Sequence, residues 1–250
     1  MDLGKPIASG NTAEIYLLHN MVVKLFRGNV LPNEAVHEAS KQTFVYSSGL
    51  PVPKVFDVTK IGSRQAIMME YIKGKTLGER LIAKELPLDE VISLTVEEQQ
   101  RLHNVTIHSS DLEQMKEKLK RQINAADQLE QLKKTKLLQL LEEIADGDKL
   151  CHGDFHLFNL IAANNRMAII DWVDASVGDI HADVYRSYLL YSQYSQEIAE
   201  KYLFYYCKAS GLSRRDIFKW APIIVAARLS ENVASEDEER LLNIIYENER

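Results

Sequence analysis

A short stretch near the middle of the chain carries side chains suited to group transfer. Residues 152–159 read HGDFHLFN, so that Asp154 and Asn159 stand five positions apart. This D-x-x-x-x-N spacing is typical of a phosphoryl-transfer catalytic loop, in which the carboxylate orients the attacking hydroxyl and accepts its proton. Because the stretch falls between a helix-like segment and a short strand, it is predicted to be a loop, with Asp154 as its catalytic residue.

A second carboxylate follows this loop closely. The strand-like run 168–170 (AII) leads to Asp171, and Trp172 comes next. Carboxylate and amide oxygens are hard ligands of the kind that hold Mg²⁺ over nucleotide phosphates, so Asn159 and Asp171 are the predicted metal ligands. Taken singly, Asp154 could be a helix cap and Asn159 a turn former. The ordered combination of loop, strand and second carboxylate favours the chemical interpretation.

The N-terminal part of the chain has the pattern of strands around one helix. Residues 12–19 and 21–26 are short β-rich runs that predict a hairpin, and residues 54–59 and 65–71 predict a second strand pair. Between the two pairs, residues 33–48 carry an apolar stripe at helical spacing. This region is therefore predicted to be a small β-rich layer with one helix.

The remainder of the chain is mostly helical in pattern. Residues 110–146 alternate charge with Leu and Ile, which predicts two amphipathic helices, and residues 160–162 and 167–170 predict one further strand pair around Asn164-Asn165. Hydroxyl residues mark expected helix starts. Complete capping boxes begin at Thr76, Thr95, Ser110 and Ser235, and a hydroxyl without the glutamate stands at Ser195.

These elements predict an α+β protein of two lobes. Residues 1–72 form the small β-rich lobe, which would bind a nucleotide, and residues 73–250 form the larger helical lobe with the catalytic loop and the acceptor site. Lys73-Gly74 is the natural hinge.

Composition limits the class of protein further. The chain has 250 residues, 46% of them hydrophobic and 26% charged, which is typical of a soluble globular protein. A net charge of −6 disfavours a nucleic-acid footprint. The longest apolar stretch, residues 220–227, is too short to span a bilayer, and the N-terminus lacks a signal-peptide pattern. The chain has only two cysteines, Cys151 and Cys207, and no CxxC pair, so we expect a protein of the reducing cytoplasm. From the charge and the short apolar stretches we expect neither nucleic-acid nor membrane partners.

The catalytic motif also resembles that of a known family. The stretch 152–159 followed by 170–172 (IDW) is similar to the signature of aminoglycoside phosphotransferases and choline kinases, which have a protein-kinase-like fold. The resemblance extends over nearly the whole chain. It implies an enzyme that uses ATP or GTP with Mg²⁺ to move the γ-phosphate to a hydroxyl of a small molecule, such as an aminoglycoside, a choline-like amine or another metabolite.

The resemblance also assigns roles to single residues. Residues 7–16 are similar to the family's nucleotide-binding hairpin, residues 22–25 to the strand with the phosphate-binding lysine, and residues 68–74 to the hinge whose backbone binds adenine. Residues 178–183 (GDIHAD) look like a variant of the family's Gly-Asp-Pro-x-x-Asp segment. The implied nucleotide-binding residues are Ser9, Gly10, Lys24, Glu38, Glu70, Ile72 and Ile170.

Departures from related kinases narrow the substrate. The loop at 8–14 has one glycine where the G-x-G-x-x-G template has three, although Ser9 and the amides near Gly10 could still bind phosphate. Trp172-Val173 replaces the Phe-Gly of protein kinases. That replacement, with no evident Ala-Pro-Glu element or long activation segment, favours a small molecule over a protein as acceptor.

Several residues allow more than one interpretation. Most strand lysines are exposed, so Lys24 gains its functional interpretation only from the motif downstream. Glu34, one helical turn from Glu38, is its rival as partner of Lys24. His152 is expected to be a packed residue, while His156 could bond to the Asp171 backbone or face the substrate.

The tyrosines near the C-terminal side of the motif also have two interpretations. Tyr185, Tyr188, Tyr191 and Tyr194 recur every three residues, which predicts a helical stripe. The stripe is either a core face or an aromatic wall for the acceptor, and the core interpretation is favoured.

Two other functions compete with the kinase. One is a nucleotide-binding pseudokinase without turnover, against which the joint presence of Lys24, Asp154, Asn159 and Asp171 argues. The other is a metallohydrolase that uses His152, Asp154 and His156 with His181 and Asp183.

Overall fold

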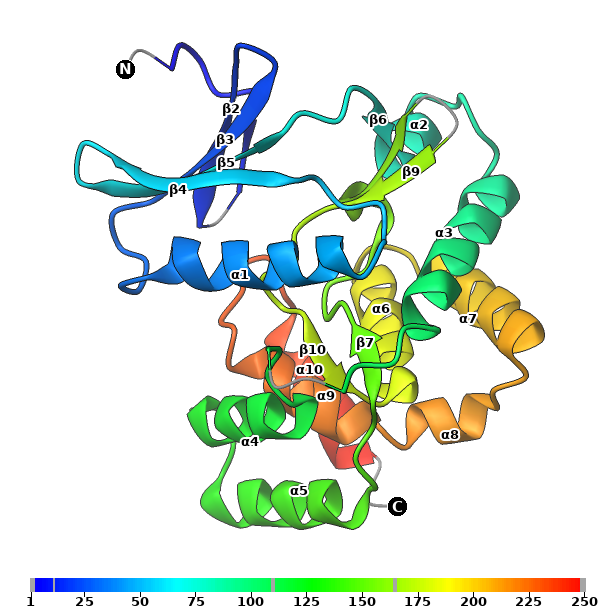
Figure 1. Cartoon of the computed structure of the whole chain (residues 1–250). Helices are drawn as coiled ribbons and strands as arrows, with labels where there is room; N and C mark the ends of the chain where they lie inside the picture. Colours follow the sequence, from blue (N-terminus) through cyan, green and yellow to red (C-terminus); the bar gives the residue numbers. More distant parts are fainter. Residues whose placement is uncertain (1–2, 11, 109–110, 164–165, 248–250) are drawn as a thin grey trace. The chain divides into compact units, whose positions relative to one another are not determined.

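The computed structural model divides the chain into two compact units (Figure 1). It describes residues 3–10, 12–108, 111–163 and 166–247. Unit 1 comprises residues 1–85 and 157–173, and unit 2 comprises residues 86–156 and 174–250. The units are thus interleaved in sequence, unlike the consecutive lobes 1–72 and 73–250, because a strand pair late in the chain joins unit 1. The functions expected of the two lobes remain predictions.

Unit 1 contains a five-stranded antiparallel sheet in the order β1-β2-β3-β5-β4. The strands are β1 (Ala8–Ser9), β2 (Ala13–Leu18), β3 (Met21–Phe26), β4 (Val55–Ile61) and β5 (Arg64–Glu70). Both predicted hairpins are confirmed. In the hairpin of β2 and β3, His19 and Asn20 have φ of 46° and 65°, as a two-residue turn that continues the strand twist requires.

Alternation along the strands sends side chains to two faces of this sheet. On one face Val23 and Leu25 pack with Tyr16 and Ala66. On the other face Phe26 packs with a helix, α1 (Glu34–Ser47), which confirms the predicted helix and runs along the sheet in Figure 1. Lys24 shares this face with Phe26, and its Nζ lies 5.6 Å from the centroid of the Phe26 ring. The alternation therefore directs Lys24 toward α1.

A smaller three-stranded sheet completes unit 1, in the order β6-β8-β9. It is formed by β6 (Lys75–Thr76), β8 (Leu160–Ala163) and β9 (Arg166–Ile169), beside α2 (Leu77–Ile82) and the 3₁₀ turn η1 (Leu157–Asn159). The predicted late strand pair is confirmed, while its turn at Asn164-Asn165 lies outside the described residues. Because β6 pairs with β8, the late strand pair belongs to the same unit as the N-terminal strands.

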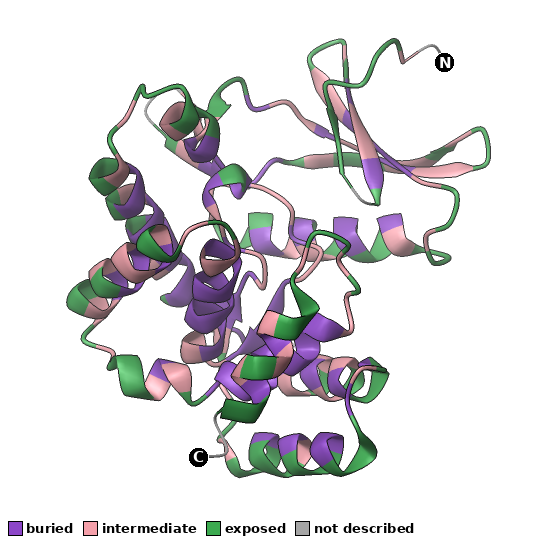
Figure 2. Cartoon of the chain, turned by 180° about the vertical axis from the view of Figure 1, so that it is seen from behind, coloured by how far each residue is buried: buried purple, intermediate pink, exposed green. Residues whose placement is uncertain are grey.

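Unit 2 is mainly helical. Its helices are α3 (Leu88–His103), α4 (Met115–Ala125), α5 (Gln131–Glu143), α6 (Ile180–Tyr194), α7 (Gln196–Ser210), α8 (Arg214–Phe218), α9 (Ala221–Leu229) and α10 (Glu238–Glu247), with the antiparallel pair β7 (Lys149–Cys151) and β10 (Ser176–Gly178). The two predicted amphipathic helices are α4 and α5. Helix α9 is buried along its whole length and α6 along most of it, as the purple colouring of Figure 2 shows.

The predicted helix starts are partly confirmed. Thr76 forms a complete capping box with Glu79 at α2, and Ser195 caps α7. The predicted helix start at Thr95 is wrong, because Thr95 lies inside α3 and its hydroxyl donates to the Val91 carbonyl at 2.8 Å. The predicted capping box at Ser235 is also wrong, since α10 begins three residues later, at Glu238, and Asp237 accepts the Arg240 amide at 3.1 Å. Ser110 lies outside the described residues.

The helices of the described ranges bear on the membrane question as well. None of them combines the length and the apolar character that a bilayer crossing requires.

Candidate active site

The buried side chain of Lys24 forms two ion pairs within unit 1. Its Nζ lies 2.7 Å from Glu38 Oε1 on α1 and 3.1 Å from Asp171 Oδ1. Burial alone lowers the pKa of Lys24, but the two carboxylates raise it above its ordinary value. The lysine therefore stays charged, and it links a strand, a helix and the segment that follows β9.

The partner of Lys24 is Glu38 and not its rival Glu34, which stands one turn earlier. Glu38 is only 2% exposed and lies on the buried face of α1 with Ala35 and Ala39. Burial raises the pKa of Glu38, an effect that the adjacent Lys24 charge opposes. A buried carboxylate of this kind is tolerated because its cation is in direct contact.

The segment around Asp171 is fixed by backbone contacts. Asp171 has φ of 66°, a left-handed conformation that is uncommon outside glycine. The Ile170 amide donates to the Asn159 carbonyl at 3.0 Å, which brings Asn159 and Asp171 onto neighbouring segments. Trp172 is fully buried, and its Nε1 donates to the Ile169 carbonyl at 3.0 Å. Asp171 therefore leaves the end of β9 in a defined direction.

The predicted metal ligands have the right donor chemistry. Asn159 is 7% exposed at the end of η1, whereas the Asp171 side chain is 39% exposed. An amide oxygen and a carboxylate on adjacent segments suit a hard cation such as Mg²⁺. The residues present thus fit the metal that phosphoryl transfer requires.

The hairpin expected to cover the phosphates is held by an arginine that the motif does not include. Arg27 Nη2 donates to Ser9 Oγ at 3.0 Å and to the Gly10 carbonyl at 3.1 Å. The Gly10 amide donates to the Ala13 carbonyl at 2.9 Å. The Gly10 amide, one of the donors predicted to meet phosphate, is therefore bonded to Ala13, while the Ser9 hydroxyl oxygen accepts from Arg27.

The predicted adenine-binding residues follow the last strand of the main sheet. Glu70 ends β5, where its amide donates to the Lys54 carbonyl at 2.8 Å and its carboxylate lies 3.3 Å from Arg166. Ile72, two residues on, is buried with 7% exposure. The amide of Ile170 is bonded to Asn159, as described above. The binding roles of these residues remain predictions.

Asp154, the predicted catalytic residue, lies in unit 2. Its Oδ2 lies 3.4 Å from His156 Nε2, a contact that the two alternatives for His156 did not include. Burial raises the pKa of Asp154, but the hydrogen bond and charge of His156, with Arg186 and His152, lower it overall. Asp154 is therefore ionised at neutral pH and can accept a hydrogen bond from a hydroxyl. His152 is fully buried and packs edge-on against Phe155, as expected.

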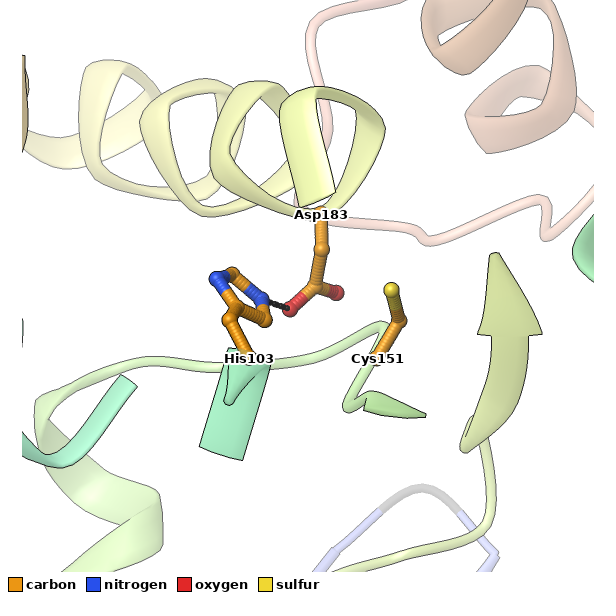
Figure 3. A group of neighbouring side chains, drawn as sticks. All are labelled: His103, Cys151 and Asp183. Atoms are coloured by element: carbon orange, nitrogen blue, oxygen red, sulfur yellow. Dashed lines mark hydrogen bonds and ion pairs between the residues drawn. The ribbon is translucent and has the colours of Figure 1, made fainter. Parts of the chain in front are cut away.

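The catalytic loop is anchored by a buried carboxylate. Asp183 on α6 accepts the Gly153 amide at 2.7 Å and the His152 amide at 3.3 Å. Figure 3 shows Asp183 beside His103 and Cys151, with His103 Nε2 2.9 Å from Asp183 Oδ2. Burial raises the pKa of Asp183, yet the hydrogen bond and charge of His103 lower it to about 2.

His103, Cys151 and Asp183 are residue types that can bind a metal, but in this structure His103 and Asp183 are hydrogen-bonded to protein groups. The other ring nitrogen of His103 is 2.5 Å from the Tyr206 hydroxyl, and burial holds the pKa of the Cys151 thiol well above its ordinary value. His181, part of the metallohydrolase alternative, is paired with Asp179 at 2.6 Å. Among the described residues, the group of His, Cys, Asp or Glu side chains close enough together to share a metal ion is His103, Cys151 and Asp183, which differs from the set His152, Asp154, His156, His181 and Asp183 of the metallohydrolase alternative.

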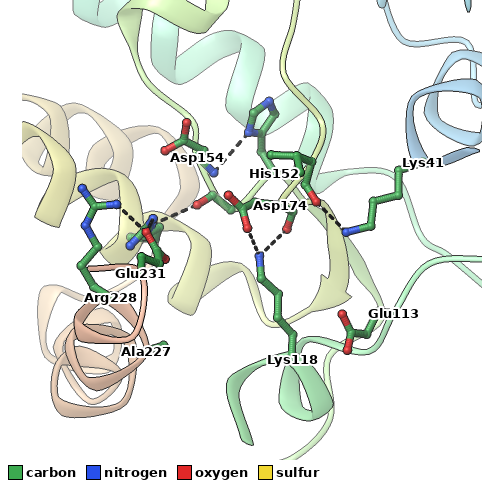
Figure 4. A network of polar contacts seen from close by, with 12 residues as sticks. Lys41, Glu113, Lys118, His152, Asp154, Asp174, Ala227, Arg228 and Glu231 are labelled. Atoms are coloured by element: carbon green, nitrogen blue, oxygen red, sulfur yellow. Dashed lines mark hydrogen bonds and ion pairs between the residues drawn. The ribbon is translucent and has the colours of Figure 1, made fainter. Parts of the chain in front are cut away.

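Charged side chains surround the loop (Figure 4). Lys118 Nζ lies 2.6 Å from Asp174 Oδ1, and Arg186 Nε donates to the Gly153 carbonyl at 3.0 Å. Neither Lys118 nor Arg186 was predicted from the sequence, because each acts through a partner distant in sequence. Asp183 was noted only within the GDIHAD segment.

The tyrosine stripe proves to be mostly core. Tyr185, Tyr188 and Tyr191 are 2%, 7% and 6% exposed, whereas Tyr194 at the end of α6 is 80% exposed. Tyr185 packs edge-on against Phe218 with ring centroids 5.2 Å apart. The favoured core interpretation is confirmed for the three buried rings.

Comparison with known proteins identifies the family. A sequence model of the phosphotransferase enzyme family matches residues 4–218, so the chain belongs to that family. Protein LicA homolog of Metamycoplasma hominis is 27% identical over 164 residues, which are 60% of this chain and 57% of that protein. The match thus spans little more than half of the relative's length.

Solved structures show the fold. A thermostable mutant of aminoglycoside phosphotransferase APH(4)-Ia is similar with a TM-score of 0.69 and 15% identity, over 98% of this chain and 94% of that one. ADP-bound aminoglycoside phosphotransferase APH(2'')-Ib is similar with a TM-score of 0.60 and 21% identity, over 97% of this chain and 90% of that one. A choline/ethanolamine kinase family protein from Mesorhizobium loti is similar with a TM-score of 0.63 and 13% identity, over 96% of this chain and 84% of that one. These similarities confirm the predicted α+β, protein-kinase-like fold class.

Proposed function

We propose that the protein is a small-molecule kinase, which transfers the γ-phosphate of ATP to a hydroxyl group with the help of Mg²⁺. The observation that carries the proposal is the double ion pair of Lys24 with Glu38 and Asp171. In kinases of this fold class such a lysine binds phosphates and such an aspartate binds the metal. Family membership agrees with this interpretation.

Each charged residue then has a distinct role. Lys24, held by Glu38, would neutralise the α- and β-phosphates, while Asn159 and Asp171 would hold Mg²⁺. When bound, Mg²⁺ supplies a positive charge that offsets the charge developing on the transferred phosphoryl group. Asp154 would orient the acceptor hydroxyl and take its proton.

The acceptor is proposed to be a small molecule that binds on unit 2, the unit that carries Asp154. The cavity that adjoins the catalytic loop there, lined in part by Gly153, Lys118, Ile224 and Glu231, measures only about 40 Å³, far below the roughly 300–1,000 Å³ of a small-molecule pocket, so it does not itself enclose the acceptor. The buried tyrosines of α6 are not available to such a ligand.

The proposal is tested first by binding and then by turnover. MgATP should raise the melting temperature more than ATP with a chelator, because Asn159 and Asp171 act through the metal. At a hundredfold excess over Kd the native state gains about 2.7 kcal/mol. A screen of phosphate acceptors with MgATP, followed by ADP release, then identifies the substrate.

Two variants separate the roles of the carboxylates. Asp154→Asn should keep MgATP binding and lose transfer, whereas Asp171→Ala should lose the magnesium-dependent part of binding as well. An unchanged melting curve with saturating MgATP would contradict the kinase proposal. Equal loss of nucleotide binding in both folded variants would contradict the role given to Asp154.

A further inference from the structure

Arg186 makes a buried contact with the backbone of the catalytic loop. It lies on α6, is 7% exposed, and its Nε donates to the Gly153 carbonyl at 3.0 Å. That carbonyl belongs to the peptide group that joins Gly153 to Asp154. The amide of the same peptide group donates to His152 Nδ1 at 3.2 Å, the contact drawn between His152 and Asp154 in Figure 4. Both ends of this peptide are therefore fixed.

The contact differs from the one that Asp183 makes. Asp183 binds the amides of His152 and Gly153, which precede the peptide in question. The Arg186 contact acts instead on the carbonyl of the peptide that joins Gly153 to Asp154. Gly153 has φ of +80°, so the chain turns sharply here, and the orientation of this peptide determines where the Asp154 side chain points.

The charge of Arg186 also lies close to carboxylates, one of which belongs to the catalytic loop. Its Nη2 lies 2.9 Å from Glu231 Oε2, and its guanidinium interacts electrostatically with the carboxylates of Asp154 and Asp174. Removing a guanidinium from water is costly unless carboxylates and hydrogen-bond acceptors replace the water. Here one buried cation compensates several carboxylates, of which one belongs to the loop.

We propose that Arg186 is a positioning residue for phosphoryl transfer: it holds the Gly153–Asp154 peptide and so aims the Asp154 carboxylate at the acceptor hydroxyl. The inference rests on the proposed function, in which Asp154 meets that hydroxyl. Arg186 acts through the loop and does not itself touch the substrate in this role. Its loss should therefore affect turnover and leave nucleotide affinity, which depends on unit 1 residues, almost unchanged.

The chain offers a matched control in Arg228. This arginine on α9 is 8% exposed and also binds Glu231, as Figure 4 shows, but its other partner is Glu236. Arg228→Met and Arg186→Met therefore remove equally buried guanidinium groups from the same carboxylate. Only the second variant removes a contact to the catalytic loop.

The experiment measures MgATP hydrolysis, with water as acceptor, together with hydrogen exchange of the peptide spanning residues 150–157. Arg186→Met should lower kcat at least about tenfold while the KM for ATP changes less than about twofold. The reason is that Arg186 acts on the Asp154 loop, whereas the residues proposed to bind the nucleotide lie in unit 1. Exchange in residues 150–157 should become faster, and exchange in α7 should not. Arg186→Lys should restore part of kcat, since an ammonium group can also donate to the carbonyl. Arg228→Met should show none of the loop-specific effects.

The outcomes distinguish this inference from the proposed function. Wild-type kcat in folded Arg186→Met, or unchanged exchange in residues 150–157, overturns the positioning role. Equal losses in Arg186→Met and Arg228→Met also overturn it, because they indicate general destabilisation. If the wild type neither hydrolyses MgATP nor transfers its phosphate, the proposed function fails, and the exchange measurement still decides whether Arg186 holds the loop.

Discussion

The Nζ of Lys41 donates a hydrogen bond of 2.6 Å to the backbone carbonyl of Val173. Lys41 stands three residues after Glu38 on α1, so both project from similar faces of the helix. Glu38 holds Lys24, which in turn reaches Asp171, and Lys41 holds the chain two residues beyond Asp171. Helix α1 thus restrains the segment of the proposed metal ligand from both sides.

Replacement of Lys41 should weaken magnesium-dependent binding. Asp171 has a left-handed conformation, which costs about 1–3 kcal/mol and persists only when surrounding contacts hold it. In Lys41→Met we expect the Kd for MgADP to rise about tenfold, the value of one lost hydrogen bond to a charged group. Calorimetric titration with ADP, with and without Mg²⁺, measures the effect.

Lys41→Arg is the control, because it keeps a cationic donor within reach of the carbonyl. It should bind MgADP nearly as the wild type does. Equal weakening of ADP binding with and without Mg²⁺ in Lys41→Met would show that Lys41 supports the unit as a whole and not the metal ligand.

A second prediction concerns the two glycines Gly153 and Gly211, which have φ of +80° and +76°. A Cβ at Gly153 would lie 2.7 Å from the Asp174 carbonyl oxygen, whereas a Cβ at Gly211 would meet nothing within 4 Å. Gly211→Ala should therefore cost about 1 kcal/mol, from backbone conformation alone. Gly153→Ala should cost clearly more, because the loop must also move away from Asp174.

Urea unfolding of the two glycine variants measures this difference. The structure also predicts that Gly153→Ala lowers kcat, since the shift displaces Asp154. Equal free energies of unfolding for the two variants would mean that the close approach to Asp174 is absent in solution.

A third prediction separates the buried and exposed ends of the tyrosine stripe. Tyr185→Ala should cost about 3–5 kcal/mol, as large aromatic truncations in a core do, because its ring packs against Phe218. Tyr194→Ala should stay within about 0.5 kcal/mol of the wild type, since Tyr194 is 80% exposed. Melting temperatures and the KM of the identified acceptor are measured on both. If Tyr185→Ala were as stable as the wild type and its KM for the acceptor rose, Tyr185 would contact the acceptor and would not be a core residue.

The parts of the site that could be predicted are those written in contiguous sequence. Asp154, Asn159 and Asp171 follow from short spacings, and the alternation of β3 places Lys24 opposite Val23 and Leu25. The choice of Glu38 over Glu34, which stand on similar faces of one helix, depended on the distance of each from the Pro51-Val52-Pro53 turn that the resembled family also has.

The residues that escaped prediction act on backbone atoms far away in sequence. Lys41 and Arg186 bind the carbonyls of Val173 and Gly153, and a backbone carbonyl leaves no trace in the sequence. Thr95 shows the converse error. Its S/T-x-x-E pattern suits a helix start, but a hydroxyl inside a helix can instead donate to the carbonyl one turn earlier.

The last prediction concerns acid stability and follows from Asp183. The folded protein lowers the pKa of this buried carboxylate to about 2, as described above, against about 3.9 in an unfolded chain. A lowered pKa contributes stability above the unfolded value, and this contribution is lost as the pH falls toward the folded value. Asp183 should therefore contribute about 3 kcal/mol at neutral pH, most of it lost between about pH 4 and pH 2.

Asp183→Asn removes the titrating group and is the variant to compare. The free energy of unfolding, measured in urea from pH 7 to pH 2.5, should favour the wild type at neutral pH, and the difference should narrow below about pH 4. A second variant, His103→Gln, keeps the carboxylate and removes the ring whose hydrogen bond and charge oppose the effect of burial on its pKa. The pKa of Asp183 should rise in that variant, so that its acid-induced loss of stability begins at a higher pH. A difference between wild type and Asp183→Asn that is constant across the whole range would mean that Asp183 has an ordinary pKa and does not hold the catalytic loop as a buried charge.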